Sequence, residues 1–447
     1  MSSLPSISDK TTIGALRLAR GVPDAVRQQI KSAVHRELIK RLDLDQLNDF
    51  DRTRAGQQQL HGLIQTLLTE HGVPLSTAER DVLAQEVIDE VFGLGPIEPL
   101  LHDPTVNDIL VNTYDSVYVE RGGILERTDI MFRDNGHLMH IIEKIVSAVG
   151  RRVDESFPMV DARLADGSRV NVIIPPLAID GPVLSIRRFG STPLSTEDLL
   201  RTKTLTRPML ELLRRAVEAR VSIVISGGTG SGKTTLLNIL SSYISTNERI
   251  VTIEDSAELA MRQRHVVRLE TRPPNVEGHG VVRQRELLIN ALRMRPDRIV
   301  LGEVRGEEAL DMLQAMNTGH DGSLTTIHSN SARDALSRIE TMAMLGDHRI
   351  PERAIRAQIA SAVQLVVQIS RLSDGSRRLT CISEVTGCHG ETITMNDLFV
   401  FERKGIGQGG KVKGQFRATG ILPHFNDKLI ACGITLPEGM LDHCFEV

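Results

Sequence analysis

The stretch ISGGTGSGKTT at residues 225–235 restricts the possible folds of this chain more than any other feature. It has the spacing G-x-x-x-x-G-K-[ST] of a phosphate-binding P-loop, directly after the apolar run 221–225 and before a predicted helix. Glycines allow positive φ, so successive N–H groups can point at phosphate oxygens, and the helix adds its positive N-terminus. A chance glycine-rich turn would need strand, spacing and helix start to coincide. The predicted nucleotide-binding residues are Gly227, Gly228, Thr229, Gly230, Ser231, Gly232, Lys233, Thr234 and Thr235.

After residue 207, apolar runs alternate with helical stretches, which is the pattern of a mostly parallel sheet covered on both faces. In such sheets ligands bind beyond the carboxyl ends of the strands, so the residues after each run are candidates for chemistry. Glu254, Glu303 and His328 each follow one of these runs. The runs are 221–225, 250–253, 299–301, 324–327 and 365–369. The predicted fold class is therefore α/β, with a nucleotide-binding core.

Transfer of a phosphoryl group to water needs a metal-bound phosphate, a carboxylate that orients the attacking water and a cation for the developing charge. Lys233 is expected to reach the β- and γ-phosphates, and Thr234 with Glu303 to bind Mg²⁺. We interpret His328 as a sensor of the bound phosphate, although a histidine can also be a hydrogen-bonded core residue. The cation is either Arg305 of the same domain or an arginine from the preceding domain, in the same or a neighbouring subunit.

Composition excludes some classes of protein. The chain has 447 residues, a net charge of −4, no Trp and 3% aromatic residues, which argues against a surface that binds nucleic acid. It shows neither a signal peptide nor a long apolar stretch, which predicts a cytosolic or peripheral protein. The four cysteines lie in the last part of the chain without a C-x-x-C pair, which favours free thiols and no bound zinc. A metal site that uses Cys388 and His389 stays open.

Periodicity and glycine or proline breaks divide the chain. We expect a flexible leader at 1–22, a helical domain at 23–92 with a solvated basic face, and an α+β N-terminal domain at 93–190. A linker at 191–206 and an ATPase domain with a C-terminal extension at 207–447 complete the order.

Arginines gather in two predicted strands of the N-terminal domain. A two-residue turn at 166–167 would pair Arg169 with Leu164. Because strand faces alternate, Arg163 and Arg169 are then expected on opposite faces. A further strand at 184–189 carries two more arginines. Each arginine alone could be an ordinary exposed cation.

Four sequence motifs now resemble a known family, the ATPases of type II and type IV secretion and of type IV pili. They are the Walker A loop 227–234, an Asp box TIEDSAEL at 252–259, a Walker B stretch RPDRIVLGEVRG at 295–306 and a His box at 318–330. Within the family, the chain looks most like the Tad/Flp pilus assembly ATPase (CpaF/TadA type). That likeness covers about residue 25 to the end and rests on 93–101, 111–112, 271–278, 383–387 and 397–399. The tetracysteine zinc segment of the type II branch is absent.

The resemblance implies a RecA-like motor in a homohexamer that binds ATP and Mg²⁺ between the N-terminal and motor domains. It implies arginines donated by the N-terminal domain, which correspond here to Arg163, Arg169, Arg187 and Arg188. Because Arg163 and Arg169 are expected on opposite faces, they cannot both serve one site. Arg169 and Arg187 are therefore the preferred pair. Glu254, Glu303 and His328 would be the other catalytic residues. Such a motor would sit on the inner face of the bacterial inner membrane and assemble a pilus through a platform protein. Retraction by the same motor stays open.

Three alternatives remain at the level of sequence. A type IV secretion traffic ATPase has nearly the same motifs. A RecA-like DNA translocase would need a basic channel and DNA-stimulated hydrolysis, which the near-neutral charge disfavours. A nucleotide-binding scaffold without turnover is disfavoured by the intact Lys233, Glu303 and His328.

Overall fold

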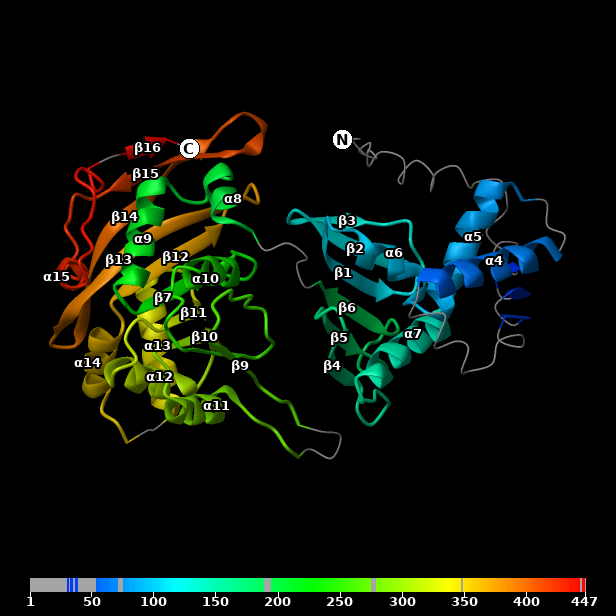
Figure 1. Ribbon diagram of the computed structural model, residues 1–447, viewed down its shortest axis with the longest axis horizontal. Coiled ribbons are helices and arrows are strands. Elements are labelled where there is room, and N and C mark those ends of the chain that lie inside the picture. Colours follow the sequence, from blue (N-terminus) through cyan, green and yellow to red (C-terminus); the bar gives the residue numbers. More distant parts are fainter. Residues whose placement is uncertain are drawn as a thin grey trace. The chain divides into compact units, whose positions relative to one another are not determined.

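The computed structural model of the chain describes residues 54–70, 75–188, 194–274, 279–346, 349–442 and 444–446, with positions 30, 31, 33, 34, 37 and 38 of an N-terminal helix. Two compact units divide it, Met1–Gly190 and Ser191–Val447. Figure 1 shows the elements of each unit. The predicted leader at 1–22 lies outside the described residues.

The first unit begins with a helical cluster. Helices α4 (Arg54–Glu70) and α5 (Thr77–Val91) bury apolar side chains together with Ile30, Val34 and Leu38. α5 begins at a capping box in which Ser76 and Glu79 satisfy each other's backbone N–H groups. The short helices η1 (Gly95–Ile97) and α6 (Glu98–His102) follow.

A six-stranded antiparallel sheet forms the rest of the first unit, in the order β3-β2-β1-β6-β5-β4. Helix α7 (Asn135–Ala148) packs its apolar residues on one face of this sheet. The other face carries the alternate, polar positions of the strands. The strands are β1 (Val106–Thr113), β2 (Ser116–Arg121), β3 (Ile124–Arg127), β4 (Met159–Arg163), β5 (Arg169–Ile173) and β6 (Val183–Arg187).

The turn between β4 and β5 differs from the prediction. Arg163 pairs with Arg169, and the N–H of Leu164 donates to the carbonyl of Ser168 at 2.9 Å. Three residues, 165–167, therefore form the turn, and its last residue is a glycine at φ +92°. A shift of one residue in register moves a side chain to the other face. Arg163 and Arg169 consequently lie on the same face, and the prediction of opposite faces was wrong.

The second unit is built on a ten-stranded mixed sheet, in the order β16-β15-β14-β13-β12-β7-β11-β10-β8-β9. The strands from β12 to β9 in this order are parallel, and β13 to β16 extend the sheet antiparallel. The parallel strands are β7 (Ile223–Gly227), β8 (Ile250–Glu254), β9 (Val266–Glu270), β10 (Arg298–Val304), β11 (Leu324–His328) and β12 (Leu365–Arg371). The antiparallel strands are β13 (Arg377–His389), β14 (Thr392–Ile406), β15 (Val412–Ala418) and β16 (Cys444–Glu446).

Helices cover both faces of this sheet. Ile223 and Ile225 of β7 lie in one buried cluster with α9 and α10, whereas Val224 lies in another with α12 and α13. The predicted α/β class is confirmed, and all five predicted runs are parallel strands. The helices are α8 (Thr196–Arg201), α9 (Arg207–Glu218), α10 (Lys233–Ser241), α11 (Gln284–Ala291), η2 (Leu292–Met294), α12 (Glu308–Asn317), α13 (Ala332–Gly346), α14 (Glu352–Ala362), η3 (Gln408–Gly410) and α15 (Asn426–Ala431).

The segment 191–206, predicted as a linker, contains structure of its own. Helix α8 begins at a capping box of Ser195 and Asp198. Leu199 and Leu205 are buried in the core of the second unit, and the carbonyl of Thr204 accepts a bond from a β13 N–H at 2.8 Å. At least residues 196–205 therefore pack as part of this unit.

Candidate nucleotide-binding site

The P-loop connects the carboxyl end of β7 to α10. A Cβ on Gly227 would lie 2.4 Å from the carbonyl oxygen of Ile369, so only glycine fits there. Gly230 and Gly232 have φ of +67° and +99°, in the left-handed region. Gly232 is the N-cap of α10 and has no side chain with which to cap it. The first N–H groups of α10 are thus left for an anion.

Lys233 reaches back over this loop. Its Nζ donates to the carbonyl of Gly228 at 3.2 Å and lies 3.8 Å from Oε1 of Glu303. Burial lowers the pKa of Lys233, the charge of Arg305 lowers it further, and Glu303 opposes both. The ammonium therefore gains from any additional negative charge in the loop, such as a phosphate.

Arg305 joins two carboxylates at neighbouring strand ends. Its Nε and Nη2 donate to Oε2 of Glu303 at 2.9 and 2.6 Å, and its Nη1 donates to Oδ2 of Asp255 at 2.9 Å. Asp255 also accepts from Nε2 of Gln284 in α11 at 2.9 Å. Burial lowers the pKa of Arg305, but the bonds and charges of these carboxylates outweigh it and raise the pKa overall. The Glu303 carboxylate is thus held between Lys233 and Arg305.

Glu254 is only 2% exposed and differs from Glu303 in its contacts. Its Oε2 accepts the N–H groups of Glu258 and Leu259 at 2.7 and 2.9 Å. A Cβ on Gly302 would lie 3.1 Å from its Cγ, so β10 also contacts it closely. Burial raises the pKa of Glu254, which favours its protonated form relative to an exposed glutamate.

The two histidines of the His box lie in different surroundings. His328 ends β11 and pairs with Gly227, which places it beside the start of the P-loop. His320 precedes β11, and its Nδ1 lies 3.3 Å from the carbonyl of Ala315 at the end of α12. His328 is therefore the histidine that the fold brings to the site.

The arginines of the first unit form one row across its sheet. Arg163 pairs with Arg169, Arg169 with Arg187, and Arg187 with Asp108. The Nε of Arg187 donates to Oδ1 of Asp108 at 3.1 Å. Arg188 points elsewhere, since its Nη1 donates to the carbonyl of Val106 at 3.1 Å. The arginine row belongs to the first unit and the P-loop to the second. Within the first unit the arginines lie next to one another, and within the second unit the residues of the P-loop site do.

Two arginines near the P-loop escaped the sequence analysis. Arg371 ends β12, and Arg377 begins β13, where its Nε donates to the carbonyl of Gly230 at 3.0 Å. The run 365–369 had been identified as a parallel strand. Applying the rule about carboxyl ends to it, as to the other runs, would have singled out Arg371.

Comparison with known proteins identifies the family. A family model described as "type II/IV secretion system protein" matches residues 90–421. The chain belongs to this family. It is thus a secretion ATPase, an enzyme that hydrolyses ATP.

The relatives of this secretion ATPase carry names that refer to different transport systems. A protein of Mycobacterium tuberculosis named as a conjugal transfer protein is 39% identical over 307 residues, which cover 67% of this chain and 87% of the relative. The type IV secretion system protein VirB11 of Brucella suis is 32% identical, with 66% of this chain and 89% of VirB11 covered. The crystal structure of the Brucella suis VirB11 ATPase with sulphate is 29% identical, covers 67% of this chain and 95% of that one, and gives a TM-score of 0.35.

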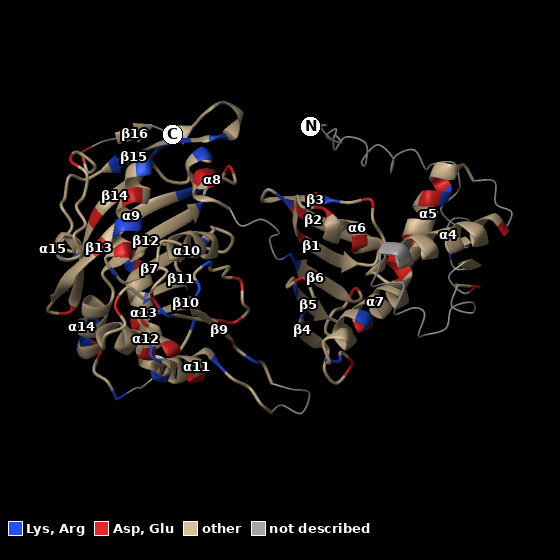
Figure 2. Cartoon of the chain, in the orientation of Figure 1, with Lys and Arg blue, Asp and Glu red and all other residues tan. Residues whose placement is uncertain are grey.

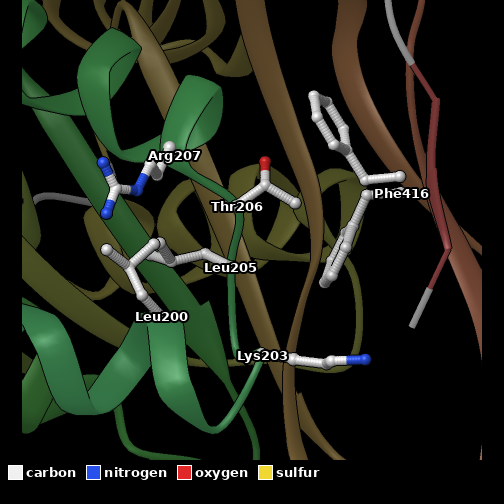
Figure 3. A pocket seen from close by; sticks show the side chains of 7 residues that line it. Leu200, Lys203, Leu205, Thr206, Arg207 and Phe416 are labelled. Carbon is white, nitrogen blue, oxygen red and sulfur yellow. The ribbon is translucent and has the colours of Figure 1, made fainter.

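Other features of the described residues do not add to this site. The pocket in Figure 3, about 230 Å³, is lined by residues between Leu200 and Arg207 together with Phe416 and Phe445, none of which belongs to the P-loop. Among the described residues, no three His, Cys, Asp or Glu side chains are grouped to hold a metal, and no helix is long and apolar enough to cross a membrane. Burial raises the pKa of Cys381 to about 12, so its thiol is protonated at neutral pH.

Proposed function

We propose that this secretion ATPase is a homohexamer that powers assembly of a Tad/Flp-type type IV pilus. It would dock on the inner face of the inner membrane and act through a platform protein there. The observation that carries the motor part is the placement of Lys233, Glu303 and Arg305 around the open N-terminus of α10. The pilus part is supported by the sequence segment 386–399, which favours a pilus motor over a type IV secretion traffic ATPase, together with 93–101 and 271–278.

The residues of the P-loop fit a nucleotide. Left-handed glycines, uncapped N–H groups and a partly buried ammonium form a cradle for phosphates, in which Lys233 would contact the β- and γ-phosphates. Thr234 and Glu303 would hold Mg²⁺, which when bound neutralises phosphate charge. We assign Glu303 to orienting the attacking water, because it is more accessible than Glu254. Glu254 fixes the 255–259 turn, and His328 senses the phosphate from the end of β11.

The cation for the developing charge is assigned to Arg169 and Arg187. They share one sheet face with Arg163, so the surface presents several guanidiniums in a row. A phosphate bound by two such groups gains charge-assisted, bidentate hydrogen bonds. We propose that a neighbouring subunit of the ring presents this row to the nucleotide.

A second candidate function is that of a type IV secretion traffic ATPase, since relatives bear the names VirB11 and conjugal transfer protein. Deletion of the gene separates the two. Loss of surface pili with intact transfer of substrate supports the pilus motor, and loss of transfer with intact pili supports the traffic ATPase. Purified protein that forms no ring with ATP and Mg²⁺ in electron micrographs would contradict both.

A further inference from the structure

The hairpin of β12 and β13 brings two arginines to the P-loop from the side away from Glu303. The sheet order is β12-β7-β11-β10, so β12 flanks the P-loop strand on one side and the strands of His328 and Glu303 lie on the other. β12 runs parallel to β7, with Ile369 beside Gly227, and Arg371 lies two residues further along. The carboxyl end of β12 is therefore at the edge of the sheet where the nucleotide binds.

Both guanidinium groups contact or approach the loop. The Nε of Arg377 donates to the carbonyl of Gly230 at 3.0 Å, and its Cδ would lie 3.4 Å from a Cβ built on Gly232. The Nη1 of Arg371 would lie 3.7 Å from a Cβ built on Gly230. An arginine has five N–H donors, so the one bond of Arg377 to Gly230 leaves donors for a ligand.

The hairpin that carries them is fixed firmly. Its turn closes with the N–H of Leu372 on the carbonyl of Ser376 at 2.7 Å. Asp374 accepts Ser376 N and Oγ at 3.0 and 2.6 Å, and the N–H of Val412 in β15 at 2.8 Å. Burial would raise the pKa of Asp374, but these bonds outweigh it and lower the pKa to about 2. The two arginines are thus positioned by a rigid turn.

Charge then indicates what the arginines bind. Arg371 and Arg377 are direct cross-strand partners, and like charges in that position repel. Lys233 and the positive N-terminus of α10 lie in the same loop region and add to the positive potential. Glu303 is paired with Lys233 and Arg305 on the other side. The negative charge in the turn of the hairpin, Asp374, accepts bonds from Ser376 and Val412. With that carboxylate engaged in the turn, the hairpin side of the loop favours a bound polyanion.

We propose that Arg371 and Arg377 form a second cationic contact for the nucleotide, directed at its α- and β-phosphates. The γ-phosphate would lie on the side of Glu303. The hairpin side would then contact the α- and β-phosphates, which ATP and ADP have in common. This inference rests on the proposed ATP site. In this proposal the second unit holds ADP after hydrolysis through its own Arg371 and Arg377, without the arginine row of the first unit.

The test measures affinity for ATP and for ADP by titration calorimetry with Arg371→Gln, Arg377→Gln and the double variant. Each single variant should weaken both nucleotides by about tenfold, as expected for loss of one charge-assisted contact. The change should fall on KM and Kd more than on kcat, and Arg377→Lys should restore part of the affinity. Arg403→Gln is the matched control and should bind like the wild type, because the Arg403 guanidinium contacts Ser373 in the turn of this hairpin and, among the described residues, has no hydrogen bond to the P-loop.

Two outcomes would overturn the inference. One is unchanged affinity for both nucleotides in the double variant, while Lys233→Ala still weakens binding. The other is weaker binding of ATP with unchanged binding of ADP, which would move the contact to the γ-phosphate. If wild-type protein bound neither nucleotide, the proposed site itself would fail, and the failure would be seen before any variant was made.

Discussion

Charge is arranged differently in the P-loop region and in the arginine row of the first unit. On the Glu303 side of the P-loop, Lys233 and Arg305 are interleaved with Glu303 and Asp255, so each of these two cations lies against a carboxylate. On the sheet of the first unit, Arg163, Arg169 and Arg187 follow one another, and acids occur only toward β1 and β2 in the same row.

We propose that this difference reflects a division of roles between the two regions. Interleaved charges compensate one another on the Glu303 side of the P-loop without nucleotide, and in the proposed function they keep Glu303 oriented for hydrolysis. The arginine row places three guanidinium groups side by side on one half of a sheet, and we propose that this charge meets the nucleotide of a neighbouring subunit. Over the described residues, basic and acidic side chains are mixed, as Figure 2 shows on the ribbons of both units. The row is therefore a local feature.

Lys233→Ala should have the largest effect in this comparison, because it removes the one ammonium of the loop. We expect loss of detectable nucleotide-dependent turnover with a folded protein, since Arg305 still compensates Glu303. ATPase assays measure the turnover, and circular dichroism measures whether the variant is folded. Full turnover by this variant would contradict the P-loop assignment.

Arg169→Ala or Arg187→Ala tests the other side of the comparison. We expect turnover to fall by about 10³-fold, at the low end for an arginine finger, while nucleotide binding and ring assembly persist. Arg188→Ala is the control for Arg187, since Arg188 contacts the backbone of β1. A greater loss for Arg188 than for Arg187 would reject the row as the finger.

Glu303→Gln keeps the shape of the side chain and removes its charge. We predict that ATP binding remains and that turnover falls by about 10²-fold, as for loss of a group that orients water or accepts a proton. Single-turnover assays separate ATP binding from ATP hydrolysis. If Glu254→Gln trapped ATP while Glu303→Gln turned over normally, the two acidic roles would have to be exchanged.

The smallest expected effect concerns stability and pH. The folded pKa of Glu254 is raised above its unfolded value, so the unfolded chain loses this proton first. Stability should therefore fall as pH rises from about 4.3 through the folded pKa and then level off. Glu254→Gln should abolish this component, measured by urea unfolding followed by circular dichroism. A variant with the same pH profile as the wild type would show that the carboxyl is not desolvated.

Local spacing explains what the sequence could predict. The P-loop, the five parallel strands and the residues at their ends depend on short motifs and apolar runs, which a sequence shows directly. The pairing of Arg305 with Asp255 spans 50 residues and depends on strand order, which no local pattern contains.

The remaining differences also have physical causes. The Asp166-Gly167 pair fits turns of two or of three residues, and only the cross-strand packing selects between them. The antiparallel strands β13 to β15 contain polar residues between their buried ones, so they lack the continuous apolar runs of the central strands. For that reason the hairpin that carries Arg371 and Arg377 was not predicted.

A mixing experiment tests most directly whether the two regions form one site across subunits. Chains with Arg169→Ala keep the P-loop, and chains with Lys233→Ala keep the arginine row. If the row acts in trans, equal mixing should restore activity at about a quarter of the sites, where an intact loop faces an intact donor. Each variant alone should stay inactive. No recovery in rings shown to be mixed would contradict donation between subunits.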